Sequence, residues 1–253
     1  MRFSSLGSGS KGNATVVHYG DTLVLIDCGF SVKETEKRLS LRGLQVSDLS
    51  GIIVTHEHSD HIRGVSSLAK KYQLPVLMTA GTYKSLKSEI HVDLTLIESD
   101  HSFSFGDLMV TPVSVAHDAR EPVQFVVRGG DITLGVLTDL GCVTPHVLEN
   151  YRFCHGLLIE CNHDEEMLAM GPYPPSLKQR VGGDWGHLNN DQTKFLLQNI
   201  QIEQLQHLVI GHISQKNNSL DIVKKVMSEI NFPPLDIHYA CQNEGFPWIE
   251  LTP

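Results

Sequence analysis

The segment that most constrains this chain is "THEHSDH", residues 55 to 61. Three histidines and one aspartate fall within six positions, directly after the apolar run of residues 51 to 54. Side chains two positions apart on an extended backbone point to the same side. His56 and His58 can therefore converge on one point, while Asp60 and His61 face another. The spacing favours two binding centres over one.

Four more ionisable residues stand at or just after the ends of apolar runs that we expect to be strands: Asp27, His117, Asp139 and His212. A carboxylate at the end of a buried strand is costly unless a positive or hydrogen-bonding group lies nearby. Taken singly, Asp27 has the alternative of capping a turn, and each histidine has that of an ordinary structural residue. Taken together with the heptapeptide, these four residues indicate that several strands end at one common edge and place possible ligands there.

If those strand ends share one edge, the chain can form two metal sites from imidazole and carboxylate groups. The first would use His56, His58 and His117, and the second Asp60, His61 and His212. Asp139 would bridge both metals through its two carboxylate oxygens. Histidine and aspartate ligands without cysteine suit zinc, manganese and iron alike, so the sequence leaves the identity of the divalent ions open.

The pattern of apolar residues predicts a fold of mixed α and β structure. Strands are expected at residues 2–6, 13–19, 22–26, 51–54, 76–78, 107–116, 122–128, 131–138, 155–160, 206–210 and 236–239. Helices are expected at residues 31–42, 62–72, 190–200 and 218–230, the second of them capped by Asp60. These elements favour two mixed sheets packed face to face with helices outside. Because no linker or repeat divides the chain, we expect one domain over residues 1–253.

Charge and composition narrow the environment and the partners. A formal net charge of −9 argues against binding nucleic acid through overall basicity, so a polyanionic substrate requires a local basic patch. The five cysteines form no CxxC pair, which favours free thiols in a reducing compartment. The first residues lack the apolar core of a secretory signal, and no apolar run reaches the length of a membrane span. We therefore expect a cytoplasmic protein without a membrane partner.

The stretch "GSGSKG", residues 7 to 12, matches the glycine pattern of dinucleotide-binding proteins. That pattern requires a helix to follow, whereas the next residues here predict a strand. We therefore interpret the stretch as a glycine hairpin. Its backbone N–H groups would still be able to approach a ligand at the rim of a site.

The H-x-H-x-D-H run and its downstream partners resemble the metallo-β-lactamase superfamily, in which residues of these types occur in this order over nearly the whole chain. The resemblance implies an αββα sandwich with a dinuclear metal site at one edge of the sheets. It also implies a metal-bridging hydroxide as the nucleophile, since metal coordination lowers the pKa of bound water towards neutrality. The commonest true β-lactamases carry cysteine at the position of Asp139, and flavodiiron proteins carry glutamate at the position of His58, so neither branch fits.

The stretches "GHLNNDQTKFLL" and "GHISQKNN" are similar to the phosphodiesterase branch that includes ribonuclease Z. This likeness implies that His187 is a general acid that assists departure of the leaving-group oxygen, and that Glu160 orients His187. Asp60 joins this catalytic set. The alternative is that His187 merely caps the helix at 190–200, although Asn189 is an equally good N-cap.

The surroundings of that set give further candidates. His163 is a candidate substrate contact, and Asp27 and Asp164 are expected to orient other site residues. Lys178 and Arg180, in a Pro-rich stretch "YPPSLKQR" that we expect to be a loop, are the candidate phosphate contacts. Basic loop residues are more often simply solvated, so that alternative stays open.

Within the superfamily the chain most closely resembles the YycJ/WalJ-like metallohydrolases, through "SLGSGSKGNATVV", "THEHSDHIRGV" and "VAHDAREPVQF". This likeness implies a 5′ to 3′ exonuclease acting on double-stranded DNA, with DNA favoured over RNA as the partner. The sequence has no room for the tRNA-binding arm of ribonuclease Z or for a β-CASP insertion. Two alternatives remain: a small-molecule hydrolase of the glyoxalase II type, acting on a thioester or lactone without His187, and a metal-binding scaffold without turnover.

Overall fold

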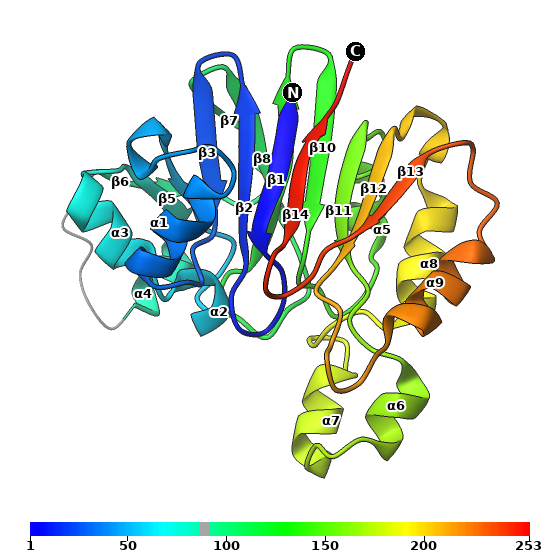
Figure 1. The fold of residues 1–253 in the computed structure, drawn as a ribbon. Helices are drawn as coiled ribbons and strands as arrows, with labels where there is room; N and C mark the ends of the chain where they lie inside the picture. Colours follow the sequence, from blue (N-terminus) through cyan, green and yellow to red (C-terminus); the bar gives the residue numbers. More distant parts are fainter. Residues whose placement is uncertain (87–91) are drawn as a thin grey trace.

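Two seven-stranded sheets lie face to face in the computed structural model, which describes residues 1–86 and 92–253 (Figure 1). The first sheet has the order β14 (Phe246–Glu250), β1 (Arg2–Gly7), β2 (Ala14–Tyr19), β3 (Thr22–Ile26), β4 (Gly51–Ile53), β5 (Val76–Thr79) and β6 (Leu94–Ile97). The second has the order β13 (Asp236–Tyr239), β12 (His207–Gly211), β11 (Gly156–Glu160), β10 (Ile132–Leu137), β9 (Val123–Gly129), β8 (Leu108–Ser114) and β7 (Phe103–Phe105).

Helices cover the outer face of each sheet. On the first sheet they are α1 (Val32–Ser40), α3 (Val65–Tyr72) and α4 (Ala80–Lys84), while the short α2 (Ser59–Ile62) lies at the edge where the strands end. Beside the second sheet lie α5 (Pro145–Asn150), α8 (Asn190–Asn199) and α9 (Leu220–Ser228), while α6 (Glu165–Met170) and α7 (Pro175–Val181) project beyond the sandwich (Figure 1). Two short 3-10 helices span Val46–Asp48 and Ile202–Gln204. The predicted αββα sandwich is confirmed.

Strict alternation along the strands explains why the sheets stack with helices outside. In β3, Val24 and Ile26 join the core between the two sheets, whereas Leu23 and Leu25 join the core under the helices of the first sheet. Successive side chains on a strand point to opposite faces, so an all-apolar strand must be covered on both. This burial provides the main driving force for the layered arrangement.

The direction of the parallel strands determines where the candidate site lies. Strands β3 to β6 run parallel in the first sheet, and β10 to β13 run parallel in the second. In such sheets the loops that follow the strands meet at one edge, where ligands bind. The candidate residues that follow β3, β4, β10 and β12 are therefore delivered to one side of the sandwich.

Two predictions about local structure were wrong. The helix expected at 62–72 is split into α2 and α3. The N–H of Gly64 donates to the carbonyl of Cys28, and the carbonyl of Asp60 accepts from the N–H of Asn13, so the helical bond between Gly64 and Asp60 is replaced. Asp60 lies within the first turn of α2 instead of capping a helix. The stretch expected to be a loop around Lys178 and Arg180 is helix α7. Pro175 occupies its first turn, where the missing N–H and fixed φ of proline suit a helix start.

The glycine hairpin and the free thiols are confirmed. β1 and β2 pair antiparallel across the glycine stretch. Gly12 has a φ of +156°, and a side chain there would lie 2.5 Å from the ring of Phe30, so the turn requires glycine. All five cysteines are free. Among the helices of the described residues, none is both long and apolar enough to cross a membrane.

Candidate metal centre

The heptapeptide is held by backbone hydrogen bonds to two other segments. The N–H of Asn13 donates to the carbonyl of Asp60 at 2.7 Å, and the N–H of Cys28 donates to the carbonyl of His61 at 2.7 Å. Gly29 lies so close that a side chain there would stand 1.8 Å from the carbonyl oxygen of Asp60. The loops after β1 and β3 therefore fix the path of the chain that carries the histidines.

Three imidazoles turn one nitrogen each towards a common point. His56, His58 and His117 offer ligand atoms that all lie within 4.8 Å of one another. Nδ1 of His58 and Nε2 of His117 are 3.1 Å apart. The structure therefore brings together the three residues predicted for the first metal.

The outward nitrogen of each of these rings has a partner. Nδ1 of His117 lies 2.9 Å from the carbonyl of Gly186, and Nε2 of His58 lies 3.1 Å from that of Asp118. Nδ1 of His56 is 2.9 Å from the hydroxyl of Thr55, while its Nε2 is buried without a hydrogen-bond partner among the described residues. Outward contacts of this kind fix the tautomer and leave the inward nitrogen free for a metal.

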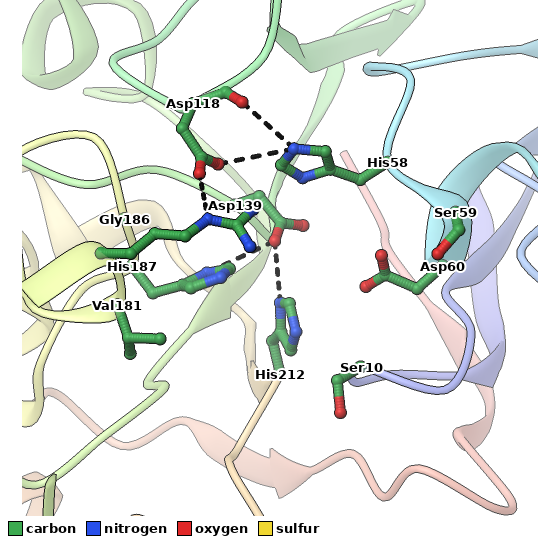
Figure 2. A pocket seen from close by; sticks show the side chains of 11 residues that line it. Ser10, His58, Ser59, Asp60, Asp118, Asp139, Val181, Gly186, His187 and His212 are labelled. Atoms are coloured by element: carbon green, nitrogen blue, oxygen red, sulfur yellow. Dashed lines mark hydrogen bonds and ion pairs between the residues drawn. The ribbon is translucent and has the colours of Figure 1, made fainter. Parts of the chain in front are cut away.

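Asp139 lies between the remaining candidates. Its Oδ2 is 3.0 Å from Nε2 of His61, and its Oδ1 is 3.1 Å from Nδ1 of His212. Oδ2 of Asp60 is 3.6 Å from Nε2 of His61. Figure 2 shows the carboxylate of Asp60 pointing into the space that Asp139 and His212 also face.

The possible ligand groups overlap at Asp139 instead of forming the predicted second trio alone. One group is His56, His61 and Asp139, and another is Asp139, Glu160, His187 and His212. A residue common to both groups is placed where a bridging carboxylate would be needed. Its assignment as a bridge stays a prediction.

Asp27 supports the ring of His61 from beneath. Its Oδ2 is 2.7 Å from Nδ1 of His61, and its two oxygens accept hydrogen bonds of 2.8 Å from the N–H and the hydroxyl of Thr55. A buried carboxylate on the far nitrogen of a histidine orients the ring and raises its basicity. Asp27 thus contacts a candidate ligand, as expected, and does more than cap a turn.

The electrostatics of this cluster favour cations. Burial lowers the pKa of His61, but Asp139 and Asp27 together raise it well above the usual range. Burial likewise lowers the pKa of His212, yet Asp139 raises it to about 10. For Asp139, burial raises the pKa, and the charges of His212 and His61 outweigh it and hold the pKa well below normal. The carboxylates thus stabilise positive charge at this edge.

The residues fit divalent metal ions. Nε2 of His56 is a buried atom without a hydrogen-bond partner among the described residues, and Oδ2 of Asp139 has an ion-pair contact with His61 but no hydrogen bond there. Such unpaired buried groups are costly and call for an explanation. A cation that accepts lone pairs from nitrogen and oxygen would satisfy both.

His187 stands beside this cluster on a buried support. Its Nδ1 is 3.0 Å from Oε2 of Glu160, whose Oε1 accepts a 2.6 Å hydrogen bond from the N–H of Leu140. Burial, followed by the charge of His212, lowers the pKa of His187 to about 4. Asn189 is the N-cap of α8, and its side chain forms a capping box with Gln192. The alternative that His187 caps this helix is therefore wrong.

A pocket of about 380 Å³ opens above these side chains (Figure 2). Its lining includes Ser10, Asp60, Asp118, Arg180, His187 and His212. The guanidinium of Arg180 is hydrogen-bonded to the carboxylate of Asp118. Arg180, unlike Lys178, is thus a cation at the mouth of the pocket.

Three other predicted site residues lie away from this pocket. The ammonium of Lys178 bonds to the carbonyl of Ala169; two positions apart on a helix, it and Arg180 face nearly opposite sides. His163 is only 2% exposed, and Asp164 caps α6 by accepting from the N–H of Met167. The lining of the pocket does not include His163, and Asp164 has a local capping role.

Sequence reasoning missed two residues that contact the site and one exposed aromatic residue that is close to it in the sequence. Asp118 holds Arg180 and touches His58, and the amide of Asn13 lies 3.0 Å from Nε2 of His61. Trp185 is 64% exposed, two positions before His187. The signal for Asp118 was its place next to His117, and that for Trp185 was an aromatic residue in a glycine-rich loop.

Comparisons with known proteins agree on one family. The model of the β-lactamase superfamily domain matches residues 22–213. The exodeoxyribonuclease YycJ of Bacillus anthracis is 35% identical over 91% of this chain and 89% of its own length, and the exodeoxyribonuclease WalJ of Streptococcus pneumoniae is 32% identical over 90% and 87%. The crystal structure of YhfI of Bacillus subtilis, a metallo-β-lactamase fold protein, superposes with a TM-score of 0.74 at 18% identity, covering 98% of this chain and 99% of that one.

Proposed function

Because this chain belongs to the metallo-β-lactamase superfamily and is a metal-dependent hydrolase, we propose that it is a nuclease with two divalent metal ions. Its substrate would be double-stranded DNA, degraded from the 5′ end. The names of the relatives YycJ and WalJ, both exodeoxyribonucleases, support this choice of substrate class. The proposal depends on the contact between Glu160 and His187 at the edge of the pocket.

The contact supports phosphodiester chemistry because burial and the charge of Asp139 raise the pKa of Glu160 well above its usual range. A protonated Glu160 would donate to Nδ1 of His187 and leave the proton of the neutral ring on Nε2, next to the ligand cluster. With Nδ1 of His187 turned to Glu160, the other ring nitrogen is left to serve the pocket that the residue lines. The alkoxide that departs when a P–O bond breaks needs a proton, and an imidazole is the usual general acid. Hydrolysis of a thioester or lactone does not require this second histidine.

The ligands for the metals would be His56, His58 and His117 on one side and Asp60, His61 and His212 on the other, with Asp139 shared. When bound, the ions supply Lewis-acid stabilisation of phosphate oxygens and lower the pKa of a water that attacks phosphorus. Asp27 would fix the orientation of the His61 ring, and Glu160 would fix that of the His187 ring. These supports are buried, so the cluster is arranged before substrate arrives.

Binding of DNA to a chain with a net charge of −9 needs local contacts. Arg180 lies at the pocket mouth and would contact a phosphate, with Asp118 fixing its direction. Trp185 offers an exposed ring on which a terminal base would stack, an interaction that tolerates any sequence. This arrangement favours recognition of a strand end over recognition of a base sequence.

The test is degradation of duplex DNA, labelled at the 5′ or the 3′ end, by the metal-loaded protein. We expect mononucleotides to be released from the 5′ end. We also expect RNA of the same sequence to be degraded more slowly than the DNA. His187→Ala should lower kcat by about 10²–10⁴-fold, the range for loss of a general acid, with unchanged metal content. His101→Ala, which removes an exposed histidine that does not line the pocket, is the matched control.

Two results would contradict the proposal. Metal-loaded protein without chelator-sensitive cleavage of DNA, RNA or bis(p-nitrophenyl) phosphate would remove nuclease chemistry. Hydrolysis of a thioester or lactone at an equal rate in wild type and His187→Ala would favour acyl chemistry of the glyoxalase II type instead.

A further inference from the structure

A second group of metal-binding side chains lies at the opposite end of the second sheet. β12 begins at His207, whereas the candidate ligand His212 follows the last residue of the same strand. A strand of this length spans roughly 16 Å at about 3.3 Å per residue. β13, the outermost strand of the sheet, begins beside it at Asp236 (Figure 1).

The strand register places three side chains on one face. His207 is paired with Asp236, and Val209 is paired with His238. Paired residues of parallel strands share a face, as do residues two apart on one strand. Ile237 and Tyr239, which alternate with these positions, pack into the core under the helices. Asp236 and His238 therefore point to the other face, together with His207.

The distances suit one metal ion. Nδ1 of His207 lies 3.2 Å from Nε2 of His238 and 3.8 Å from Oδ2 of Asp236. All three ligand atoms lie within 4.8 Å of one another. In a tetrahedral site with bonds of about 2.0–2.1 Å, neighbouring ligands stand roughly 3.3 Å apart. The two imidazole nitrogens already have this separation, and only the carboxylate would need to move.

We propose that His207, Asp236 and His238 bind a divalent transition-metal ion that links β12 to the edge strand β13. Two imidazoles and one carboxylate favour Zn²⁺, Ni²⁺ or Cu²⁺ over Mg²⁺ or Ca²⁺, which take mostly oxygen ligands. With three protein ligands, water completes the coordination. The site is independent of the proposed nuclease centre.

The exposure of the group fits a binding site that exchanges metal with solvent. The side chain of Asp236 is 77% exposed and that of His207 is 22% exposed. The ion would bind the folded chain and not the unfolded one, and it would therefore stabilise the pairing of the edge strand.

The consequence is local because the edge strand has a neighbour on one side alone. The same end of the sheet carries the C-terminal segment, where Gln206 bonds to the backbone of Thr252 at 2.7 and 3.0 Å. An ion bound to His207 would fix the start of β12, next to Gln206. It would thus stabilise both the pairing of β12 with β13 and the contact of Gln206 with the C-terminal segment.

The test counts ions per chain by elemental analysis after dialysis against Zn²⁺ or Ni²⁺ and removal of unbound metal. We expect one ion fewer in His207→Gln/His238→Gln than in wild type, with the DNA cleavage rate unchanged. When the proposed nuclease centre is already loaded with metal, added Zn²⁺ should also raise the Tm of the wild type more than the Tm of the double variant. His101→Gln/His146→Gln removes two exposed histidines outside the group and should bind as many ions as wild type.

Equal ion counts in wild type and the double variant would overturn the proposal and leave a hydrogen-bonded imidazole pair. If the double variant fails to fold, Asp236→Asn keeps the size of an exposed side chain and should weaken Zn²⁺ binding at this site. An unchanged calorimetric titration of Asp236→Asn would then count against the proposal. Absence of nuclease activity would not affect either measurement.

Discussion

The two halves of the candidate metal centre are supported in different ways. The shortest outward contacts of the histidine half, His56, His58 and His117, are to uncharged oxygens: the hydroxyl of Thr55 and the carbonyls of Asp118 and Gly186. The carboxylate of the partly exposed Asp118 is farther from these rings, at 3.5 Å from His58 and 3.6 Å from His117. The carboxylate half, Asp60, His61, Asp139 and His212, has the buried carboxylates of Asp27 and Asp139 against its imidazoles.

This difference implies a division of tasks. Neutral partners fix the orientation of a ring with little effect on its charge, whereas a buried carboxylate also stabilises a cation beside it. The carboxylate half should therefore carry more of the electrostatic attraction for metal, and the histidine half more of the geometry. Variants that remove one charge from either half test this comparison.

The largest effect is expected where the two halves meet. Asp139→Ala removes the carboxylate that lies 3.0 Å from His61 and 3.1 Å from His212. We expect kcat on duplex DNA to fall by about 10³-fold, the upper range for loss of a group that stabilises developing charge, together with loss of metal from both halves. Asp131→Ala, an exposed turn residue, is the control. Full metal content and activity in Asp139→Ala would end the idea of a shared ligand.

Asp27→Asn should have an intermediate effect confined to the carboxylate half. The amide keeps the size of the side chain but withdraws the charge that faces Nδ1 of His61 at 2.7 Å. Loss of such a support costs about 10–100-fold in metal affinity or activity. Elemental analysis should find about one ion fewer while the histidine half stays loaded. Equal loss from both halves would show that the division between them is wrong.

Asp118→Asn should have the smallest effect, because His58 keeps the backbone carbonyl of Asp118 as its partner at 3.1 Å. The variant weakens the tie to Arg180, so KM for DNA should rise by up to about tenfold, which corresponds to about 1.4 kcal/mol. kcat and metal content should stay near wild type. A fall in kcat as large as that of Asp27→Asn would mean that the histidine half also depends on charge.

The sequence predicted which candidate ligands would gather because their positions follow from strand ends. An apolar run that ends in histidine or aspartate favours a polar side chain at the edge of the layered sheets, where the strand stops. His56, His117, Asp139 and His212 all follow this rule, and the predicted contacts of Asp27 and Glu160 with histidines are present. That the chain acts as one domain over residues 1–253 stays a prediction, as do the roles of these residues.

Features that depend on side-chain direction were harder to predict. Lys178 and Arg180 look equivalent in the sequence, but helix α7 turns them to different sides. His163 follows the end of β11 as the candidate ligands follow their strands, yet it does not line the pocket. Short elements such as α6 and β7 carry too few residues for a periodic pattern.

The hydrogen bonds from Asn13 and Cys28 to the heptapeptide, and the close approach of Gly29, have a consequence for protein engineering. The shape of "THEHSDH" is imposed by chain segments that lie 30 to 50 positions earlier. Grafting these seven residues alone into another scaffold would transfer the ligand types without their directions. A transplant that keeps its chemistry would have to include the first three strands as well.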